Sequence, residues 1–303
     1  MAALTQLRIA AAQYPIERFA TLGDYRDKLA RWVAEAAGNG AELLVFPEYG
    51  AMEYAGANGD AVAGDLAASL AAVSSTLQDM DATHAELAQR HKVHILAASG
   101  PSALPGSRYV NAARLFTPAG RMGVQEKMIM TPFERNWGVS SGETLRVFET
   151  ALGRIGIAIC YDSEFPLLVR AQAEAGAEII LVPSCTEFHS GYARVRTAAM
   201  ARALENTCIT VLSPTVGDAL WSPAVDHNAG AAGVYVPADH GFSETGVLAE
   251  GTLNAPQWVY ADVDLARLQR VKQTGEMRNS TDWSAQPGAA PLTGTVELVS
   301  LDS

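Results

Sequence analysis

Basic residues are scarce in this sequence, and they form no cluster. Lysine and arginine together number 22 against 33 aspartates and glutamates, which gives a net charge of −11. This balance argues against nucleic acid or an anionic membrane as the main partner. Long hydrophobic runs are missing too, since the longest have the length of a strand and are too short to cross a bilayer. No basic region precedes the first apolar stretch, so a secretory leader is not expected.

Cysteine is also rare. The three cysteines, Cys160, Cys185 and Cys208, are odd in number and show no CxxC pairing. Neither a disulfide framework nor a structural zinc site is expected from this pattern, and the reducing cytoplasm is the expected location. The six histidines show no HExxH motif or clustered ligand spacing, so no metal site is expected from them either.

What the sequence does contain is an alternation of strands and helices, with 49% hydrophobic residues. Strands are predicted at 7–13, 42–48, 93–99, 110–117, 154–160, 178–184, 208–214, 232–237 and 258–264. Several are almost wholly apolar, as expected for a sheet covered on both faces. Helices are predicted at 25–40, 65–91, 164–176 and 191–206. No linker divides the chain early, so we predict one α/β domain over residues 1–275, followed by a C-terminal arm over 276–303.

Polar groups follow three of the predicted strands. The stretch "LLVFPEYG" places Glu48 at the end of a buried strand, "MGVQEKMIM" places Lys127 just after a short one, and "IAICYDSEF" places Cys160 in the same way. Ligands of open α/β folds tend to bind outside the carboxyl ends of the strands. These three side chains are therefore candidates for one shared pocket.

The three residue types suit acyl transfer. A thiol with a pKa of roughly 8.5 needs a base or a cationic neighbour to attack as a thiolate. Glu48 can act as that base, while Lys127 and the backbone N–H of Tyr161 can hold a developing oxyanion. Taken singly, however, a cysteine at the end of an apolar run is more often an inert core residue, and a lone glutamate or lysine is usually solvated. On residue types alone, the inert alternative is favoured.

The sequences of the motifs are more specific than the residue types alone. "LLVFPEYG", "QEKMIMTPFE" and "GIAICYDSEFP" occur in that order, and together they resemble the nitrilase, or carbon–nitrogen hydrolase, superfamily. The resemblance runs from about residue 7 to 264. It implies an α/β fold of the four-layer α-β-β-α sandwich type. It also implies that Cys160 is the nucleophile, Glu48 the general base and Lys127 the residue that stabilises the oxyanion.

Further expectations come from the resemblance alone. Glu134, in "TPFERNWG", matches a second glutamate that helps to position the substrate and the lysine. Members commonly pair through the helices near and after the cysteine, which implies a homodimer or higher homo-oligomer with the 276–303 arm at the interface. No metal and no organic cofactor is implied.

Residues of the motif loops are candidates for the wall of a substrate pocket. Tyr54, Phe133 and Trp137 lie near the motifs, with packing in the core or at the rim as the alternative role. Cys185 follows a buried strand beside that of Cys160, and we expect it to line the pocket rather than to act as a second nucleophile.

The substrate is a small molecule, and its class is less constrained. "CYDSEFP" is more similar to amidase-type branches than to true nitrilases, whose cysteine is followed by Trp-Glu. We therefore predict hydrolysis of a small carboxamide to acid and ammonia. Hydrolysis of an N-carbamoyl amine or amino acid is one alternative, and a nitrile substrate is another. A non-catalytic interaction scaffold is the alternative of a different class, although it would need none of Glu48, Lys127 and Cys160.

Overall fold

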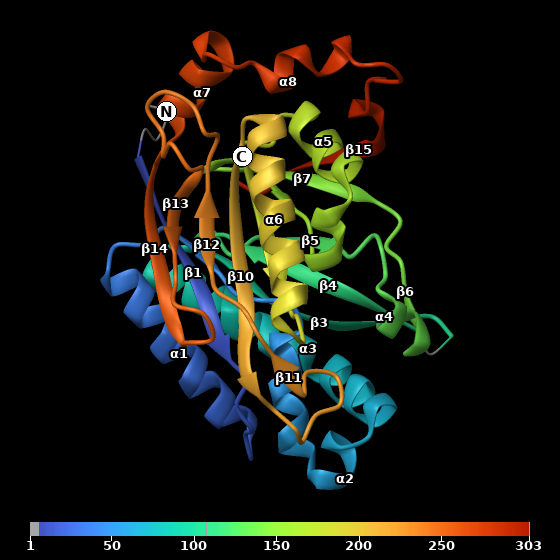
Figure 1. Cartoon of the computed structure of the whole chain (residues 1–303). Helices are drawn as coiled ribbons and strands as arrows, with labels where there is room; N and C mark the ends of the chain where they lie inside the picture. The colour runs from blue at the N-terminus through green and yellow to red at the C-terminus, as the bar shows by residue number, and fades with distance from the viewer. Residues whose placement is uncertain (1–5, 107, 303) are drawn as a thin grey trace.

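The strands of the protein form one continuous hydrogen-bonded network that folds over into two halves. The structure is a computed structural model and describes residues 6–106 and 108–302. Across these residues fifteen strands are linked in the order β15-β7-β8-β9-β10-β1-β2-β3-β4-β5, with the remaining strands as side branches. The halves join where Tyr14 of β1 pairs in parallel with Thr215 of β10. The sheet is thus nearly closed into a barrel (Figure 1).

The first half consists of β1 (Gln6–Pro15), β2 (Leu43–Val45), β3 (His94–Leu104), β4 (Arg108–Phe116), β5 (Met122–Glu126), β6 (Val139–Ser140) and β14 (Gln257–Asp264). The second half consists of β7 (Leu145–Thr150), β8 (Gly153–Ile157), β9 (Ile179–Ser184), β10 (Ile209–Asp218), β11 (His227–Asn228), β12 (Gly233–Tyr235), β13 (Val247–Glu250) and β15 (Val296–Ser300).

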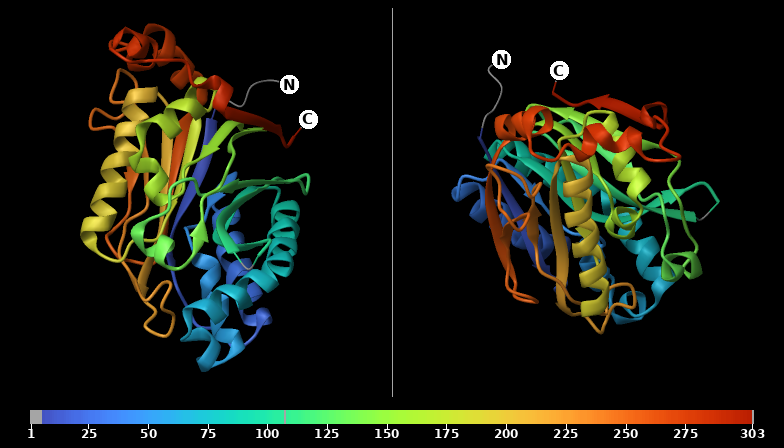
Figure 2. Two further views of the ribbon diagram at one scale, coloured as in Figure 1. Left: turned by 90° about the vertical axis from the view of Figure 1, so that its right-hand side faces the viewer. Right: turned by 45° about the horizontal axis from the view of Figure 1, so that its top comes forward.

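Two pairs of long helices cover the outer faces. They are α1 (Leu22–Gly38) and α3 (Leu66–His91) on the first half, and α5 (Pro166–Glu174) and α6 (His189–Asn206) on the second. In the side view of Figure 2, α6 lies on one side of the strands and α3 on the other. The order of layers is therefore α-β-β-α, and the predicted four-layer sandwich is confirmed.

The alternation of side chains along β1 shows why its sequence is apolar throughout. Ile9 and Ala11 belong to the core between the two halves, which extends to α6. Ala10 and Ala12 point the other way and pack in the core that includes α1 and α3. Successive residues of a strand face opposite sides, so a strand between two layers needs apolar residues at every position.

Short elements connect these layers near the strand ends. They are η1 (Gly50–Asn58), α2 (Asp60–Ala63), α4 (Pro132–Asn136) and η2 (Cys160–Glu164). None of the helices among the described residues combines the length and apolar character needed to span a membrane.

The C-terminal segment crosses one end of the two halves and then joins the sheet of its own chain. It contains α7 (Leu265–Thr274), α8 (Asn279–Asp282), η3 (Trp283–Ala285), η4 (Thr293–Thr295) and β15. β15 pairs in parallel with β7, where the C-terminal segment returns to the sheet in Figure 2. The guanidinium carbon of Arg170 of α5 lies 4.7 Å from the ring centroid of Trp283. The arm predicted over 276–303 is thus tied to its own domain, and its place at a dimer interface stays a prediction.

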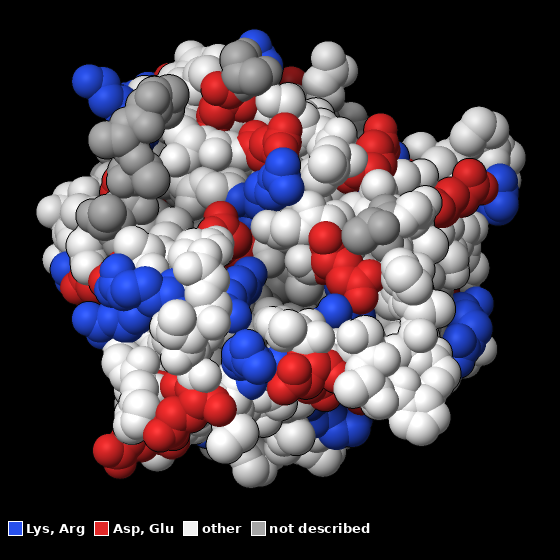
Figure 3. All heavy atoms as spheres, turned by 90° about the horizontal axis from the view of Figure 1, so that it is seen from above, with Lys and Arg blue, Asp and Glu red and all other residues white. Residues whose placement is uncertain are grey.

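The end of the molecule that this segment covers carries charges of both signs. Figure 3 shows acidic and basic side chains interspersed on that face, without a continuous basic field. A surface that attracts a polyanion would need such a field.

Candidate active site

Glu48, Lys127 and Cys160 meet in one cavity between the ends of three strands. Glu48 lies three residues after β2 ends, and Lys127 directly follows β5. Cys160 lies three residues after β8, which ends at Ile157. The predicted strand 154–160 is therefore too long by three residues, because the chain turns into η2 before presenting the thiol.

The backbone of Cys160 has a conformation that is unusual for a residue with a side chain. Its φ angle is 49°, in the left-handed region, which costs roughly 1–3 kcal/mol for a residue other than glycine. The turn is held by Ser163, whose hydroxyl donates to the carbonyl oxygen of Cys160 at 2.6 Å. It is held also by the N–H of Asp162, which donates to the carbonyl of Ile159 at 3.0 Å. These contacts fix the direction of the thiol.

Lys127 lies between two carboxylates. Its Nζ is 2.7 Å from Glu48 Oε1 and 2.7 Å from Glu134 Oε2. All three side chains are almost completely buried. Burial alone would lower the pKa of Lys127, but Glu48 and Glu134 together raise it well above its ordinary value. The lysine therefore carries a positive charge at the base of the cavity.

The two carboxylates that share Lys127 differ in proton affinity. Burial raises the pKa of Glu48 above its ordinary value, although Lys127 opposes the shift. Burial acts in the same direction on Glu134, but Lys127 and the first turn of α4 lower its pKa below the ordinary value. In that turn the N–H and hydroxyl of Thr131 both donate to Glu134 Oε2 at 2.9 Å. Glu134 is thus fixed as an anion, whereas Glu48 can accept a proton.

The thiol of Cys160 faces this charged cluster. Burial and the carboxylate of Glu48 raise the pKa of Cys160 well above its ordinary value, with Lys127 acting in the opposite direction. The Sγ atom lies 4.0 Å from the carbonyl oxygen of Cys185. The resting thiol is therefore protonated, and Glu48 is a carboxylate that interacts with it and can accept its proton.

Polar partners that the sequence did not reveal surround the cluster. Asn111 of β4 donates from Nδ2 to Glu48 Oε1 at 2.9 Å and to Glu134 Oε1 at 3.4 Å. The phenol of Tyr49 donates to Glu134 Oε1 at 3.0 Å. A buried asparagine within the apolar stretch "YVNAARLFT" was the one available sign, because a polar side chain inside such a strand needs a partner.

Asp162 is a third residue that the sequence did not indicate as part of the site. Its carboxylate accepts the backbone N–H of Met128 at 3.1 Å and that of Ile129 at 2.8 Å. These are the two residues that follow Lys127, so Asp162 connects the turn of the cysteine to the loop of the lysine. Burial raises the pKa of Asp162 to about 7, against the opposing effect of Lys127.

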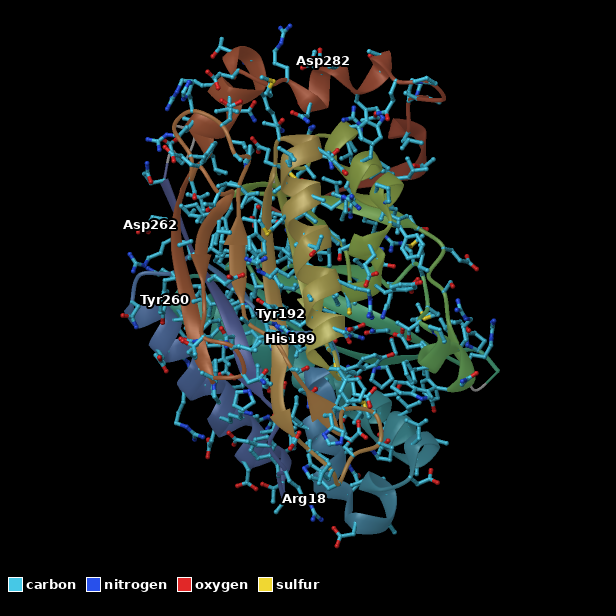
Figure 4. The ribbon with its side chains drawn as sticks, viewed as in Figure 1. Arg18, His189, Tyr192, Tyr260, Asp262 and Asp282 are labelled. Atoms are coloured by element: carbon cyan, nitrogen blue, oxygen red, sulfur yellow. The ribbon has the colours of Figure 1, made fainter. Side chains whose placement is uncertain are left out.

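The cavity has a volume of about 440 Å³. Its outer wall is formed by the first turns of α6, by α4 and by the loop before β11. Figure 4 labels His189 and Tyr192, which mark the beginning of α6 beside this wall. Across residues 6–106 and 108–302 no three His, Cys, Asp or Glu side chains are grouped as metal ligands.

Four of the five residues expected to contact substrate line this cavity: Tyr161, Phe133, Trp137 and Cys185. The fifth, Tyr54, lies elsewhere, with its ring centroid 6.4 Å from that of Tyr25 of α1. Tyr54 belongs to η1 and is not among the residues that line the cavity, so its contact with substrate stays a prediction.

Cys185 takes part in the site mainly through its backbone. Its N–H donates to Glu48 Oε2 at 3.0 Å, and its thiol lies 3.4 Å from Asn228 Oδ1. Burial and the charge of Glu48 raise the pKa of this thiol to about 12. A thiol with so high a pKa is a poor nucleophile near neutral pH, which agrees with the expectation that Cys185 lines the pocket.

Comparison with known proteins places this chain in a family. The family model described as carbon-nitrogen hydrolase matches residues 8–273. The chain therefore belongs to the carbon–nitrogen hydrolase family.

Particular relatives differ in how much of their length is matched. The chain is 34% identical over 279 residues to "Probable hydrolase YhcX" of Bacillus subtilis, covering 91% of this chain and 53% of that protein. It is 34% identical over 170 residues to the bifunctional nitrilase/nitrile hydratase NIT4A of Lupinus angustifolius, covering 52% of this chain and 48% of that one. The chain thus spans about half the length of these two relatives. Omega-amidase NIT2 of Homo sapiens is 26% identical over 293 residues and is covered to 93%, against 89% of this chain.

Solved structures show the same fold. Nit3 of Saccharomyces cerevisiae superposes with a TM-score of 0.71 at 19% identity, covering 89% of this chain and 94% of that one. An amidase from Nesterenkonia sp. superposes with a TM-score of 0.67 at 22% identity, covering 94% and 98%.

Proposed function

We propose that this chain hydrolyses the carbon–nitrogen bond of a small carboxamide, giving an acid and ammonia through a thioester on Cys160. The observation that carries the proposal is the convergence of Cys160, Glu48 and Lys127 in one cavity, with Nζ of the lysine 2.7 Å from the carboxylate of Glu48. These are the three groups that acyl transfer requires: a nucleophile, a base and a cation for the oxyanion.

In the first half of the reaction Glu48 accepts the proton of the Cys160 thiol as Sγ bonds to the amide carbon. The electron pair of the carbonyl moves to oxygen, and the resulting oxyanion is held by the ammonium of Lys127 and the backbone N–H of Tyr161. When the carbonyl forms again, the carbon–nitrogen bond breaks. Glu48 gives its proton to the nitrogen, and ammonia leaves.

Water completes the cycle. Glu48 takes a proton from a water molecule, the oxygen of which attacks the thioester carbon, and the same donors hold the second oxyanion. Collapse breaks the carbon–sulfur bond, and Cys160 recovers a proton from Glu48. One amide and one water are consumed, and one carboxylic acid and one ammonia are formed.

The different proton affinities of the two glutamates support their different roles. Glu48 has a raised pKa and lies where it can exchange protons with the thiol. Glu134 has a lowered pKa because Lys127 and Thr131 stabilise its charge. We therefore assign proton transfer to Glu48, and to Glu134 the task of holding the lysine in place.

Similarity to the omega-amidases supports an amide as the substrate. Omega-amidases of Danio rerio and Homo sapiens are each covered to more than nine tenths of their length, whereas the nitrilase NIT4A is matched over about half. N-carbamoyl amines or amino acids and nitriles are the competing substrates in the test below. Cytoplasmic location, homodimer or higher assembly and an interface role for residues 276–303 stay predictions.

The test is to incubate the protein with a panel of amides, N-carbamoyl compounds and nitriles, while measuring ammonia and the intact mass. We expect ammonia from amides first, an acyl adduct on Cys160, and loss of both in Cys160→Ala. Cys208→Ala is the matched control, because Cys208 is buried in the core and does not line the cavity. If the wild type releases no ammonia and forms no adduct across the panel, the scaffold alternative gains support.

A further inference from the structure

Asn111 contacts all three charged members of the cluster although it does not line the cavity. Its side chain is completely buried and donates to Glu48 Oε1 at 2.9 Å and to Glu134 Oε1 at 3.4 Å. Its backbone carbonyl accepts the N–H of Lys127 at 2.8 Å. One residue of β4 thus holds both carboxylates through its amide and the lysine through its main chain.

The orientation of the Asn111 amide is fixed by Ser99 of β3. The hydroxyl of Ser99 accepts the backbone N–H of Tyr49 at 3.0 Å and lies 2.7 Å from Asn111 Oδ1. An amide oxygen can only accept, so the single hydroxyl proton of Ser99 points at Oδ1. The NH₂ group must therefore face the two carboxylates. The carboxylates require the same orientation independently, because ionised Glu48 and Glu134 can only accept and the group that faces them must be a donor.

Two carboxylates that share one ammonium repel each other, and in a buried site this repulsion favours protonation of one of them. An N–H donor placed between them opposes this effect, because it stabilises the ionised form of each. Glu48 is the more easily protonated of the two, since Glu134 has the additional donors of Thr131. Loss of the Asn111 donor would therefore lead to protonation of Glu48 before that of Glu134.

We propose that Asn111 is a positioning residue of the active site, which holds Glu48 and Glu134 on Lys127 and keeps Glu48 in its ionised, proton-accepting form. The inference rests on the proposed function, since it gives Glu48 the task of accepting the proton of the thiol. Asn111 acts through Glu48 and Glu134 and does not line the cavity itself.

The sign of the expected change follows from the contact. An N–H that donates to a carboxylate lowers the pKa of that carboxylate, so removal of Asn111 Nδ2 raises the pKa of Glu48. The titratable groups that face Glu48 from the surrounding elements stay in place: Lys127, Glu134, Cys160, Cys185, Tyr49 and Asp162. The acid limb of any reaction that needs ionised Glu48 should therefore move to higher pH.

Iodoacetamide is a probe that needs no knowledge of the substrate. Its rate of reaction with Cys160 is measured against pH by peptide mass spectrometry, with glutathione in the same mixture as the reference for reagent reactivity. In Asn111→Ala we expect the midpoint of the acid limb to rise by about one to two pH units. Ser99→Ala, which retains the amide but frees it to rotate, should shift the midpoint in the same direction by less. With an amide substrate, kcat should fall at neutral pH while KM stays unchanged.

Asn206→Ala is the matched control, because Asn206 is also buried and donates from Nδ2 to the carbonyl of Arg202 at 3.1 Å, away from the cavity. It should lower the melting temperature without moving the midpoint. The inference is overturned if Asn111→Ala and Ser99→Ala keep the midpoint of the wild type, or if Asn206→Ala moves it equally. If Glu48→Gln shows the same pH profile of alkylation as the wild type, Glu48 is not the base. That outcome counts against the proposed function and is distinct from a failure of Asn111.

Discussion

The backbone N–H of Cys185 donates to Glu48 Oε2 at 3.0 Å, and this bond joins the two halves of the sheet at the candidate active site. Glu48 follows β2 of the first half, and Cys185 follows β9 of the second. The other carboxylate oxygen, Oε1, accepts from Lys127 and Asn111. Three donors from three different segments therefore fix one carboxylate, so its position depends on the assembled fold.

Glu48→Gln should separate the proton-transfer role of this side chain from its place in the fold. The glutamine amide has one oxygen for three donors, and it cannot accept the proton of the thiol. We expect a folded protein whose turnover is slower by about 10²–10⁴-fold, the usual contribution of a general base. The rate of ammonia release and the melting temperature measure the two effects. Glu86→Gln, at an exposed residue of α3, is the control, and unchanged turnover in Glu48→Gln would refute the assigned role.

Lys127→Met should destabilise the protein in a manner that depends on pH. Without the ammonium, two buried carboxylates face each other, and removal of one partner from a buried pair costs about 3–5 kcal/mol. Burial and the charge of the second carboxylate then raise the pKa of Glu48 without an ammonium to oppose them, so the folded state binds protons more tightly than the unfolded state. Stability of the variant should therefore fall as pH rises above about 4, the pKa of a carboxyl in the unfolded chain.

Unfolding in urea at several pH values measures this effect. The double variant Lys127→Met with Glu134→Gln removes one of the two like charges and should recover part of the loss. A loss of stability in Lys127→Met that is the same at every pH would contradict the electrostatic explanation.

The sequence predicts well those features that depend on local pattern. Apolar runs locate the main strands, and the abrupt change to polar residues after them locates Glu48, Lys127 and Cys160. Strands between two layers are apolar at every position, so the sequence predicts both where these strands lie and that they are buried.

The supporting residues are less visible because their partners are distant in the chain. Asn111 lies 63 residues from Glu48 and Asp162 lies 34 residues from Met128, and no local spacing indicates either contact. The left-handed turn at Cys160 was missed for a similar reason, since it is stabilised by packing and by Ser163 rather than by a glycine. Tyr54 is near a motif in sequence but does not line the cavity, because nearness in sequence does not determine the direction of a side chain.

Asp162→Asn should disturb the lysine loop while leaving the cluster of charges intact. The carboxylate now accepts two backbone N–H groups, whereas an asparagine has one oxygen and must turn its NH₂ toward one of those donors. We expect lower thermal stability and a kcat reduced by about tenfold or more, since small displacements of catalytic groups are costly. Steady-state kinetics would show this as a change in kcat. A variant that loses stability but keeps the kcat of the wild type would make Asp162 a purely structural residue.

The end of the chain provides a test of how the C-terminal segment is held. Asp302 Oδ2 accepts from His94 Nε2 and from the N–H of Ala151, each at 2.9 Å. Burial would raise the pKa of Asp302, but these partners lower it below its ordinary value. The ionised carboxylate therefore adds stability above about pH 4, and this stability is lost as pH falls through the lowered pKa.

Asp302→Asn should accordingly lower the melting temperature at pH 7, with a difference from the wild type that shrinks below about pH 4. Asp282→Asn is the control at an exposed aspartate of α8, which Figure 4 labels on the outside of the molecule. A difference between Asp302→Asn and the wild type that is the same at pH 3 and pH 7 would exclude the carboxylate as its source.

Phe133 and Tyr54 form a matched pair of aromatic residues for a test of the cavity wall. Phe133 lines the cavity with 61% of its surface exposed, whereas Tyr54 packs against Tyr25 outside it. With the best amide of the panel, Phe133→Ala should raise KM by roughly fivefold, because about 1 kcal/mol of apolar contact with the substrate is lost. Its melting temperature should not change, since an exposed ring contributes little to the core. Tyr54→Ala should do the reverse, lowering the melting temperature while KM stays constant. An increase in KM for Tyr54→Ala alone would show that Tyr54 contacts the substrate. The binding surface would then lie on the side of η1.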